Sequence, residues 1–296
     1  MARFCIMELQ INKLIEVGSD SKDPVESIKN FDRSRMITGL VQEGFNLIEL
    51  GGDLGLFFPT AYDHQNIQRL LAIKEALGIS YSLHLPLWSV EPSTPLEPVR
   101  LGSVQAILDI INATKPLDPE VYVLHATGAL AAEFYRMNLP DNVKSLVLKQ
   151  FQLGAVNSIK AILEESGIYS RKLAIETIEF PFDLTMEIAE LLDLSICLDT
   201  GHVLAGFSGS ISIPDVFKAC AHRLAEIHLH DSPNFLKTGQ LGYGKDHQAL
   251  GKGDLDIEHL FQLIKQNNFT GPIIFELTVE EAQRSIHYLQ ESGAML

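Results

Sequence analysis

The chain of 296 residues is 46% hydrophobic and 21% charged, which is typical of a globular protein with a sizeable core. Its formal net charge of −15, without any run of Lys and Arg, disfavours nucleic acid as a partner, because phosphate backbones are bound by clustered cations. No apolar run approaches the roughly 18 residues of a membrane span, and the first residues lack the cleavage site of a secretory signal, so we expect a cytoplasmic protein that binds no membrane.

Seven short apolar segments recur along the chain, and each of them predicts a buried strand. They are residues 45–50, 80–86, 121–126, 172–177, 195–200, 225–231 and 272–277. An eighth strand is expected within the first seventeen residues, where either "FCIMEL" or "KLIEV" could supply it.

Segments with apolar residues at three- and four-residue spacing separate the strands and predict helices. They cover residues 33–43, 64–77, 98–114, 142–166, 183–193, 213–222, 256–267 and 279–291. Asp63 and Asp141 stand where helices should begin, and Gly78 and Gly167 where helices should end. Eight strand–helix pairs without a linker predict an α/β fold, a (β/α)8 TIM barrel, as a single domain over residues 1–296.

The longest segment without a periodic pattern is the glycine-rich stretch 231–256. A loop of that length is usually functional. In a barrel it would follow the seventh strand and lie on the face where active sites form.

Acidic and histidine side chains stand at the C-terminal ends of six predicted strands, where barrel enzymes build their sites. They are His84, His125, Glu176, Asp199, His228 and Glu276. Each of them alone could be a rim histidine or a helix-capping carboxylate. Burying them together without cations would be costly, because desolvation and like charges both oppose ionisation. Mixed imidazole and carboxylate donors suit zinc or manganese better than magnesium or calcium, so we expect a transition-metal site.

Further polar residues stand close to these strand ends. His202 lies three residues after Asp199 and could face the same cluster, and His247 could reach it from the 231–256 loop. Three more residues are expected to contact substrate or to support the ligands: Glu49, His230 and Asp231. No G-x-S-x-G, P-loop or H-E-x-x-H motif is present, so the sequence indicates no rival catalytic motif.

Seven motifs in chain order resemble the xylose isomerase-like TIM barrels, particularly the apurinic-endonuclease type (AP endonuclease family 2). They are "SLHLP", "VLHATG", "AIET", "CLDTGH", "IHLHDS", "HQALGKGDLD" and "IIFEL", within residues 45–280. The resemblance implies that His84, His125 and Glu176 hold one metal ion. It implies that a second ion is held by Glu176, Asp199, His228 and Glu276.

The resemblance also implies a third ion, held by His202, His247 and an aspartate two residues before His247. Here that position is Lys245, and the nearest acid is Asp246. Either Lys245 contacts a phosphate oxygen of the substrate, or Asp246 takes the place of the missing aspartate. We therefore expect two metal ions and leave the third open.

Two functions fit these residues. The first, which we favour, is metal-dependent hydrolysis of a small phosphoester or phosphodiester, in which the ions lower the pKa of a water molecule and stabilise the oxygens around phosphorus. A nucleotide-bearing cofactor such as a corrinoid is one substrate that the resemblance suggests. The second is a sugar isomerase, epimerase or inosose dehydratase with a single metal, in which Glu176 and Glu276 exchange protons as acid and base. The second function leaves His84, His125 and His247 without a role.

Overall fold

The computed structural model describes residues 3–8 and 32–294. Eight parallel strands form a closed barrel in which the strands follow one another in sequence order. They are β1 (Arg3–Met7), β2 (Leu47–Gly51), β3 (Ser80–His84), β4 (Tyr122–Leu124), β5 (Leu173–Glu176), β6 (Ser195–Asp199), β7 (Leu224–His228) and β8 (Pro272–Phe275). The predicted (β/α)8 barrel is confirmed. The first strand comes from "FCIMEL", and "KLIEV" lies outside the described residues.

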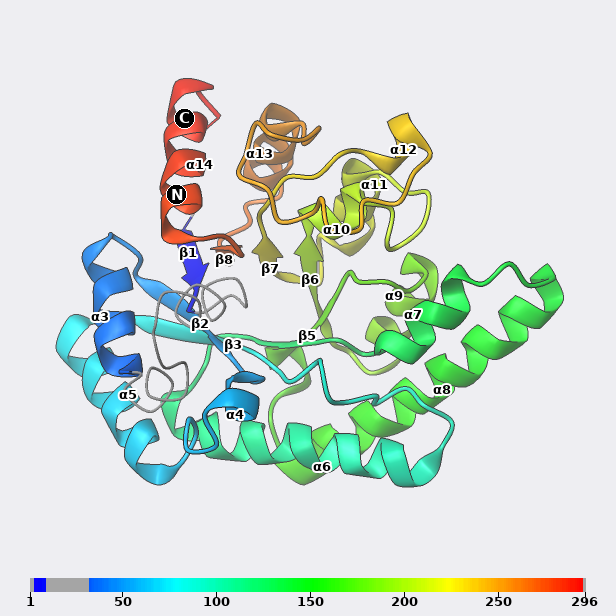
Figure 1. Cartoon of the computed structure of the whole chain (residues 1–296), viewed down its shortest axis with the longest axis horizontal. Helices are drawn as coiled ribbons and strands as arrows, with labels where there is room; N and C mark the ends of the chain where they lie inside the picture. Colours follow the sequence, from blue (N-terminus) through cyan, green and yellow to red (C-terminus); the bar gives the residue numbers. More distant parts are fainter. Residues whose placement is uncertain (1–2, 9–31, 295–296) are drawn as a thin grey trace, which may run out of the picture.

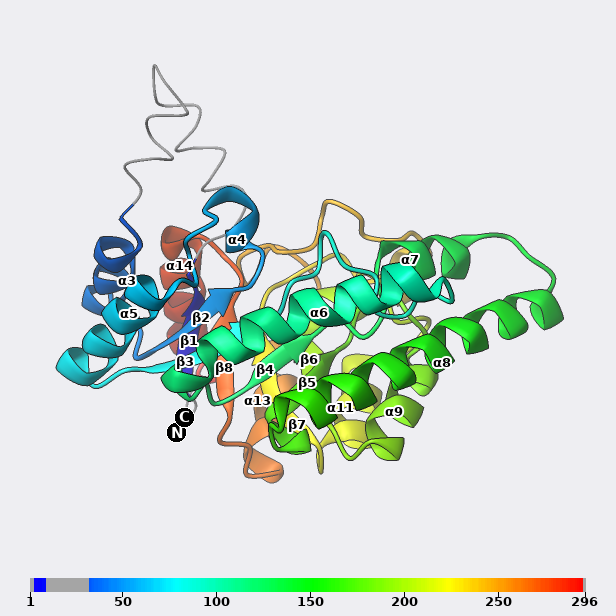
Figure 2. The same cartoon turned by 90° about the horizontal axis from the view of Figure 1, so that it is seen from below.

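Helices lie around the outside of the strands (Figure 1). Those predicted from the sequence are α3 (Arg33–Gln42), α5 (His64–Leu77), α6 (Glu97–Thr114), α8 (Asp141–Ser166), α9 (Phe182–Leu191), α11 (Ile213–Cys220), α13 (Ile257–Gln266) and α14 (Val279–Glu291). Four more were not predicted: α4 (Leu54–Phe57), α7 (Ala129–Arg136), α10 (Thr200–Leu204) and α12 (Phe235–Thr238). The N-terminal end of α8 projects to one side of the barrel (Figure 2). None of the helices that the structure describes is long and apolar enough to cross a membrane.

The local signals for helix ends explain most of the boundaries. Asp63 accepts a hydrogen bond from the backbone N–H of Asn66 at the start of α5, and Gly78 ends that helix with φ 66°. Gly167 ends α8 in the same left-handed conformation, with φ 65°. Asp141 is the first residue of α8 and not its N-cap, which is Pro140.

The register of the strands brings their C-terminal ends to one mouth. Asp199 of β6 lies opposite His228 of β7, and Gly51 of β2 lies opposite His84 of β3. All five residues of β6 are buried, because helices cover the outer face and side chains fill the interior. The polar strand ends therefore face one another above an apolar core.

Candidate metal centre

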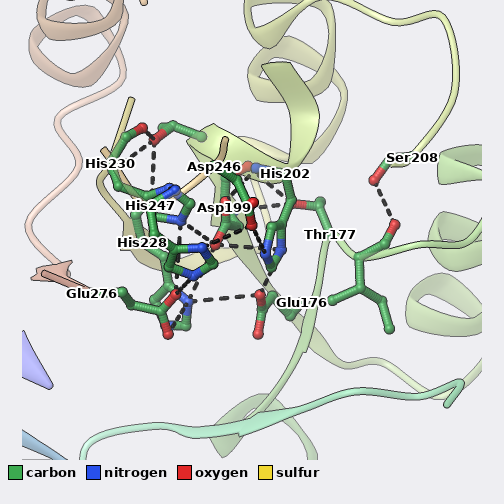
Figure 3. A network of polar contacts seen from close by, with 12 residues as sticks. Glu176, Thr177, Asp199, His202, Ser208, His228, His230, Asp246, His247 and Glu276 are labelled. Atoms are coloured by element: carbon green, nitrogen blue, oxygen red, sulfur yellow. Dashed lines mark hydrogen bonds and ion pairs between the residues drawn. The ribbon is translucent and has the colours of Figure 1, made fainter. Parts of the chain in front are cut away.

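Side chains from the ends of β3 to β8 meet at the mouth of the barrel. Figure 3 shows Glu176, Asp199, His228 and Glu276 pointing toward one another. His84 and His125 join them from β3 and from the residue after β4, through hydrogen bonds to Glu176. Histidine and carboxylate groups that could hold metal ions occur here in several overlapping combinations.

The two carboxylate oxygens of Glu176 face two different groups of donors, by which we mean side-chain atoms that could coordinate a metal ion. Glu176 Oε2 lies 3.0 Å from His84 Nε2 and 2.9 Å from His125 Nε2. Glu176 Oε1 lies 3.1 Å from His202 Nδ1 and 3.8 Å from His228 Nδ1. This is the arrangement that a carboxylate bridging two metal ions requires.

The second group of donors surrounds Nδ1 of His228. That atom lies 3.8 Å from Asp199 Oδ2 and 3.4 Å from Glu276 Oε1. It is buried and has no hydrogen-bond partner among the described residues. A buried imidazole nitrogen without a partner is costly, and a divalent cation coordinated by these same atoms would satisfy it. The residues therefore fit a metal ion of the kind that takes nitrogen and oxygen ligands.

The opposite nitrogen of His228 faces two carboxyl groups inside the barrel. His228 Nε2 lies 3.3 Å from Glu226 Oε1 and 3.5 Å from Glu49 Oε2. Both glutamates are fully buried and neither lines the cavity at the mouth. Glu49 thus lies behind the candidate metal ligands, where it can support His228, one of the two roles expected for it. Contacts of this kind orient a metal-binding histidine from behind.

Asp199 and the short helix α10 explain the "DTGH" sequence. Asp199 Oδ1 accepts the backbone N–H of His202 at 2.7 Å and so caps α10, while Oδ2 faces the histidines of the mouth. A side chain at Gly201 would come within 2.1 Å of the ring of His230. The glycine therefore permits the histidine to pack against this turn.

His230 holds Asp199 in place. Its Nδ1 accepts the backbone N–H of His247 at 2.9 Å, so its Nε2 carries the proton and donates to Asp199 Oδ2 at 2.8 Å. Burial lowers the pKa of His230, in keeping with a neutral ring. With both nitrogens engaged and the side chain fully buried, His230 supports a ligand in this structure, which is one of the two roles expected from the sequence.

A third group of candidate ligands lies at the rim, where His202 and His247 lie beside Asp199 and the hydrogen-bonded His230. Asp246 Oδ2 lies 2.8 Å from His247 Nδ1 and 3.8 Å from His202 Nε2. His247 has φ 56°, an uncommon backbone conformation for a residue other than glycine. Asp246 is therefore the acid that faces both His202 and His247, and its replacement of the missing aspartate stays a prediction. Lys245 is exposed and does not line the cavity, so its contact with substrate stays a prediction.

Asp231, for which we expect either a substrate contact or a supporting role, holds the 231–256 loop through its carboxylate. Its two oxygens accept backbone N–H groups of Ser232, Gly251, Gly253 and Leu255 at 2.9 to 3.0 Å. Asp231 is buried and lies away from the cavity. Its carboxylate thus fixes the loop that carries Asp246 and His247.

The carboxylates at the mouth of the barrel favour the positively charged, protonated form of the neighbouring histidines. Burial lowers the pKa of His84, but the hydrogen bond to Glu176 and the surrounding carboxylates outweigh it and raise the pKa to about 9. Burial is likewise outweighed at His202, where Asp199 and Glu176 raise the pKa to about 9. Burial raises the pKa of Glu276, but His228 and His247 hold it well below its ordinary value. The metal-free site therefore binds protons that a divalent cation would displace.

One cavity of about 540 Å³ opens over these donors. Its lining includes six of the eight metal-binding candidates, His84, His125, Glu176, His202, His247 and Glu276, together with Asp246. Asp199 and His228 lie beneath it. The remaining wall is formed by the ends of β1 and β2, by the residues that follow β1, β2 and β3, by Leu54 and Phe57 of α4, and by Gly244 of the 231–256 loop.

Comparisons with known proteins place this geometry in context. A family model described as xylose isomerase-like TIM barrel matches residues 39–292. An uncharacterised protein of Methanocaldococcus jannaschii is 24% identical over 231 residues, which are 77% of this chain and 74% of that protein. A probable endonuclease 4 of Mycobacterium leprae is 33% identical over 99 residues, which are 33% of this chain and 36% of that protein.

A solved structure shares the fold over nearly the whole length. The crystal structure of a D-tagatose 3-epimerase-like protein superposes with a TM-score of 0.69 and 18% sequence identity. The match covers 98% of this chain and 96% of that chain. At this level of identity the likeness shows the fold alone.

Proposed function

This chain belongs to the xylose isomerase-like TIM barrel family, and on that premise we propose that it is a metal-dependent hydrolase of a small phosphoester or phosphodiester. The observation that carries the proposal is the position of Glu176 between two groups of donors. An enzyme with a single metal ion needs only one of these groups. A second, complete group that shares the same carboxylate supports a site for two ions.

These contacts support the following ligands for the two ions. His84, His125 and Glu176 would hold the first ion. The second would be held by Glu176, Asp199, His228 and Glu276. His202 and His247, with Asp246 nearby, provide donors for a third. Zinc and manganese suit this mixture of imidazole and carboxylate ligands.

Two adjacent divalent ions, when bound, supply a water molecule of lowered pKa and stabilise negative charge on the attacking and leaving oxygens at phosphorus. The chain's own residues keep the donors in position. His230 orients Asp199, and Glu226 with Glu49 orients His228. Burial raises the pKa of Glu176, but His125 and His228 outweigh it and hold that pKa well below its usual value, so Glu176 stays ionised.

Hydrolysis at phosphorus also gives every histidine at the mouth a role. The chain's net charge of −15 disfavours a long nucleic acid. A cavity of about 540 Å³ has the size of sites that bind small molecules. The expected partner is therefore a small phosphorylated compound.

A sugar isomerase or epimerase is the second candidate, and the fold comparisons favour it over hydrolysis. The similar solved structure is that of a D-tagatose 3-epimerase-like protein. Glu176 and Glu276 both line the cavity and both face Nδ1 of His228, at 3.8 and 3.4 Å. These two carboxylates could exchange protons with a sugar beside one metal ion. A sugar isomerase or epimerase with one metal ion would not use His84 and His125.

Metal content and activity separate the two candidates. We expect at least two equivalents of metal in the purified protein and hydrolysis of bis(4-nitrophenyl) phosphate. The variants His84→Ala and His125→Ala should each lose about one equivalent and lower kcat/KM at least 100-fold, because the first ion loses a ligand. His222→Ala, which changes an exposed histidine, is the matched control and should behave as the wild type.

The opposite outcome would reject the hydrolase. It consists of one equivalent of metal that both substitutions leave in place, with no release of nitrophenolate. Exchange of a carbon-bound hydrogen of a ketose with deuterated water, lost in Glu276→Gln, would then support the sugar epimerase.

A further inference from the structure

The cavity over the metal donors has two unlike halves. One half carries the histidines and carboxylates of the candidate metal centre. The other half is lined by apolar side chains, which are Met7, Leu54, Phe57, Leu87 and Trp88. Because the halves form one continuous cavity, a molecule whose phosphorus lies at the donors would place its remaining groups against the apolar half.

Two aromatic rings form the exposed part of this wall. Phe57 and Trp88 meet edge to face, with ring centroids 6.1 Å apart and an interplanar angle of 88°. Phe57 is 38% exposed and Trp88 is 49% exposed. Large aromatic side chains left open inside a cavity are surfaces on which flat ligand groups stack.

Both oxygens of Glu8 and one oxygen of Asp53, the charged groups in this half, already accept hydrogen bonds. Both oxygens of Glu8 bind the guanidinium of Arg33, at 2.6 and 2.8 Å, and one also accepts the backbone N–H of Gly51. Asp53 Oδ2 accepts the backbone N–H groups of Leu87 and Trp88, at 2.9 and 3.4 Å. A sugar here would need free hydrogen-bonding groups to pair its hydroxyls, whereas this wall offers chiefly apolar and aromatic surface.

Asp53 also explains how Phe57 and Trp88 are held in position before a ligand binds. It precedes α4, which carries Phe57, and its carboxylate binds the backbone at Trp88 in the connection between β3 and α6. The two connections are therefore tied together at the point where the rings meet. A surface positioned before the ligand arrives loses less entropy on binding.

We propose that Trp88, with Phe57 as its edge-on neighbour, binds an aromatic ring system of the substrate and sets the enzyme's specificity for aryl-bearing phosphodiesters. This inference rests on the proposed hydrolase and names the class of its substrate. The ring would lie on the non-leaving side of the phosphodiester, so that its stacking positions phosphorus over the donors.

Trp88 is the only tryptophan of the chain, so its fluorescence reports directly on this surface. We expect 1-naphthyl phosphate to quench or shift the emission of the metal-loaded protein with a saturable curve. Inorganic phosphate, which binds at the donors alone, should leave the emission nearly unchanged. Equal changes with both ligands, or none with 1-naphthyl phosphate while it inhibits hydrolysis, would overturn the proposal.

Two substrates with the same leaving group test specificity. Bis(4-nitrophenyl) phosphate carries an aryl group on the non-leaving side, and methyl 4-nitrophenyl phosphate carries a methyl group there. In Trp88→Ala the ratio of kcat/KM for the aryl over the methyl substrate should fall about tenfold, as expected for the loss of one stacking partner. Trp88→Phe should recover most of that ratio.

Leu146→Ala is the matched control, because Leu146 is 63% exposed on α8 and does not line the cavity. In Leu146→Ala the ratio of kcat/KM for the aryl over the methyl substrate should equal that of the wild type. An unchanged ratio in Trp88→Ala, in protein with normal metal content and circular dichroism, contradicts the proposal. If neither diester is hydrolysed but 1-naphthyl phosphate still quenches Trp88, the hydrolase fails while the aromatic surface stands.

Discussion

Glu226 is a buried carboxyl group inside the barrel whose pKa favours the protonated form. Burial raises its pKa well above the ordinary value, and Glu49 adds to that effect against the hydrogen bond from His228. A protonated Glu226 can still accept the proton on His228 Nε2, which leaves Nδ1 facing the metal donors. The residue therefore acts on the site through His228 and not by touching substrate.

Replacing Glu226 tests this protonation state. Glu226→Gln should change the free energy of unfolding little, because glutamine resembles the neutral acid in shape and polarity. Glu226→Ala should lower it by about 1–3 kcal/mol, since His228 loses its partner and a cavity is left. Urea unfolding of the metal-free protein measures both, with Glu190→Ala on the exposed face of α9 as control. Equal losses in the two Glu226 variants would mean that an ionised carboxylate is required.

At the residue scale, the sequence was informative where topology decides the position of a side chain. The donors at strand ends could be predicted, because all C-terminal ends of a parallel barrel meet at one face. Glu226 was missed, although it stands two residues before His228 and so points to the same side of β7. Glu49 and Asp231 are strand-end acids by pattern, but whether such an acid faces the cavity or the protein depends on packing that the pattern does not contain.

At the element scale, the loop 231–256 behaves as a fixed part of the fold because of Asp231. Four backbone N–H groups converge on its carboxylate, and a side chain at Gly253 would come within 2.4 Å of it. Asp231 also pairs through its backbone with Gln248, in a short antiparallel bridge beside His247. The position of His247 therefore depends on a residue that does not line the cavity.

Asp231→Ala should lower the free energy of unfolding by at least about 2 kcal/mol, because several buried N–H groups lose their acceptor. Asp231→Asn, which retains one carbonyl oxygen, should lose less. Chemical denaturation measures both values, and Asp109→Ala on the exposed side of α6 should have almost no effect. A stability of Asp231→Ala equal to that of the control would show that other contacts hold the loop.

The long helices could be predicted from periodic apolar residues and from end signals such as Asp63 and Gly78. Three of the unpredicted helices, α4, α10 and α12, have only four or five residues, too few to show a period. Helix α7 was missed although it has eight residues, as many as the predicted α11. Helix α10 forms because Asp199 caps it after the strand ends, and α4 is only four residues long. These short elements carry His202 and Phe57, so much of the rim of the site lies where sequence patterns are weakest.

At the scale of the whole molecule, the charge of the metal centre links stability to pH. His84 and His202 have pKa values of about 9 in the folded, metal-free protein, above the ordinary value of 6.5. Their contribution to stability is therefore fully present below pH 6.5 and is lost as the pH rises toward 9. Metal ions bind the unprotonated rings, so the stabilisation of the folded protein by bound metal grows as the pH rises over the same range.

We expect the difference in Tm between zinc-loaded and chelator-treated protein to widen from pH 6.5 to pH 9. Thermal unfolding at fixed free zinc, followed by circular dichroism, measures it. His287→Ala, which changes an exposed histidine of α14, should show the same widening as the wild type. A constant difference across this range would mean that proton and metal do not compete at these histidines.

The number of strand–helix pairs was enough to predict a closed barrel, because eight such units are the usual complement of that fold. It was not enough to predict the apolar half of the cavity. That surface is assembled from β1, helix α4 and the connection between β3 and α6, and nothing local in any of them indicates that Phe57 and Trp88 meet.

The shared carboxylate of Glu176 has a consequence for how the enzyme would respond to metal supply. Three carboxylates serve the two proposed ions, Glu176, Asp199 and Glu276, so a single divalent cation leaves the centre with negative charge that attracts another. Because one ligand is common to both positions, occupancy of either alters affinity at the other by the same factor. The first ion also immobilises the side chain of Glu176, so binding of the second ion does not have to overcome the loss of that conformational entropy. Loading of the two ions would then be coupled, so the dependence of activity on free metal would differ from that of two independent sites.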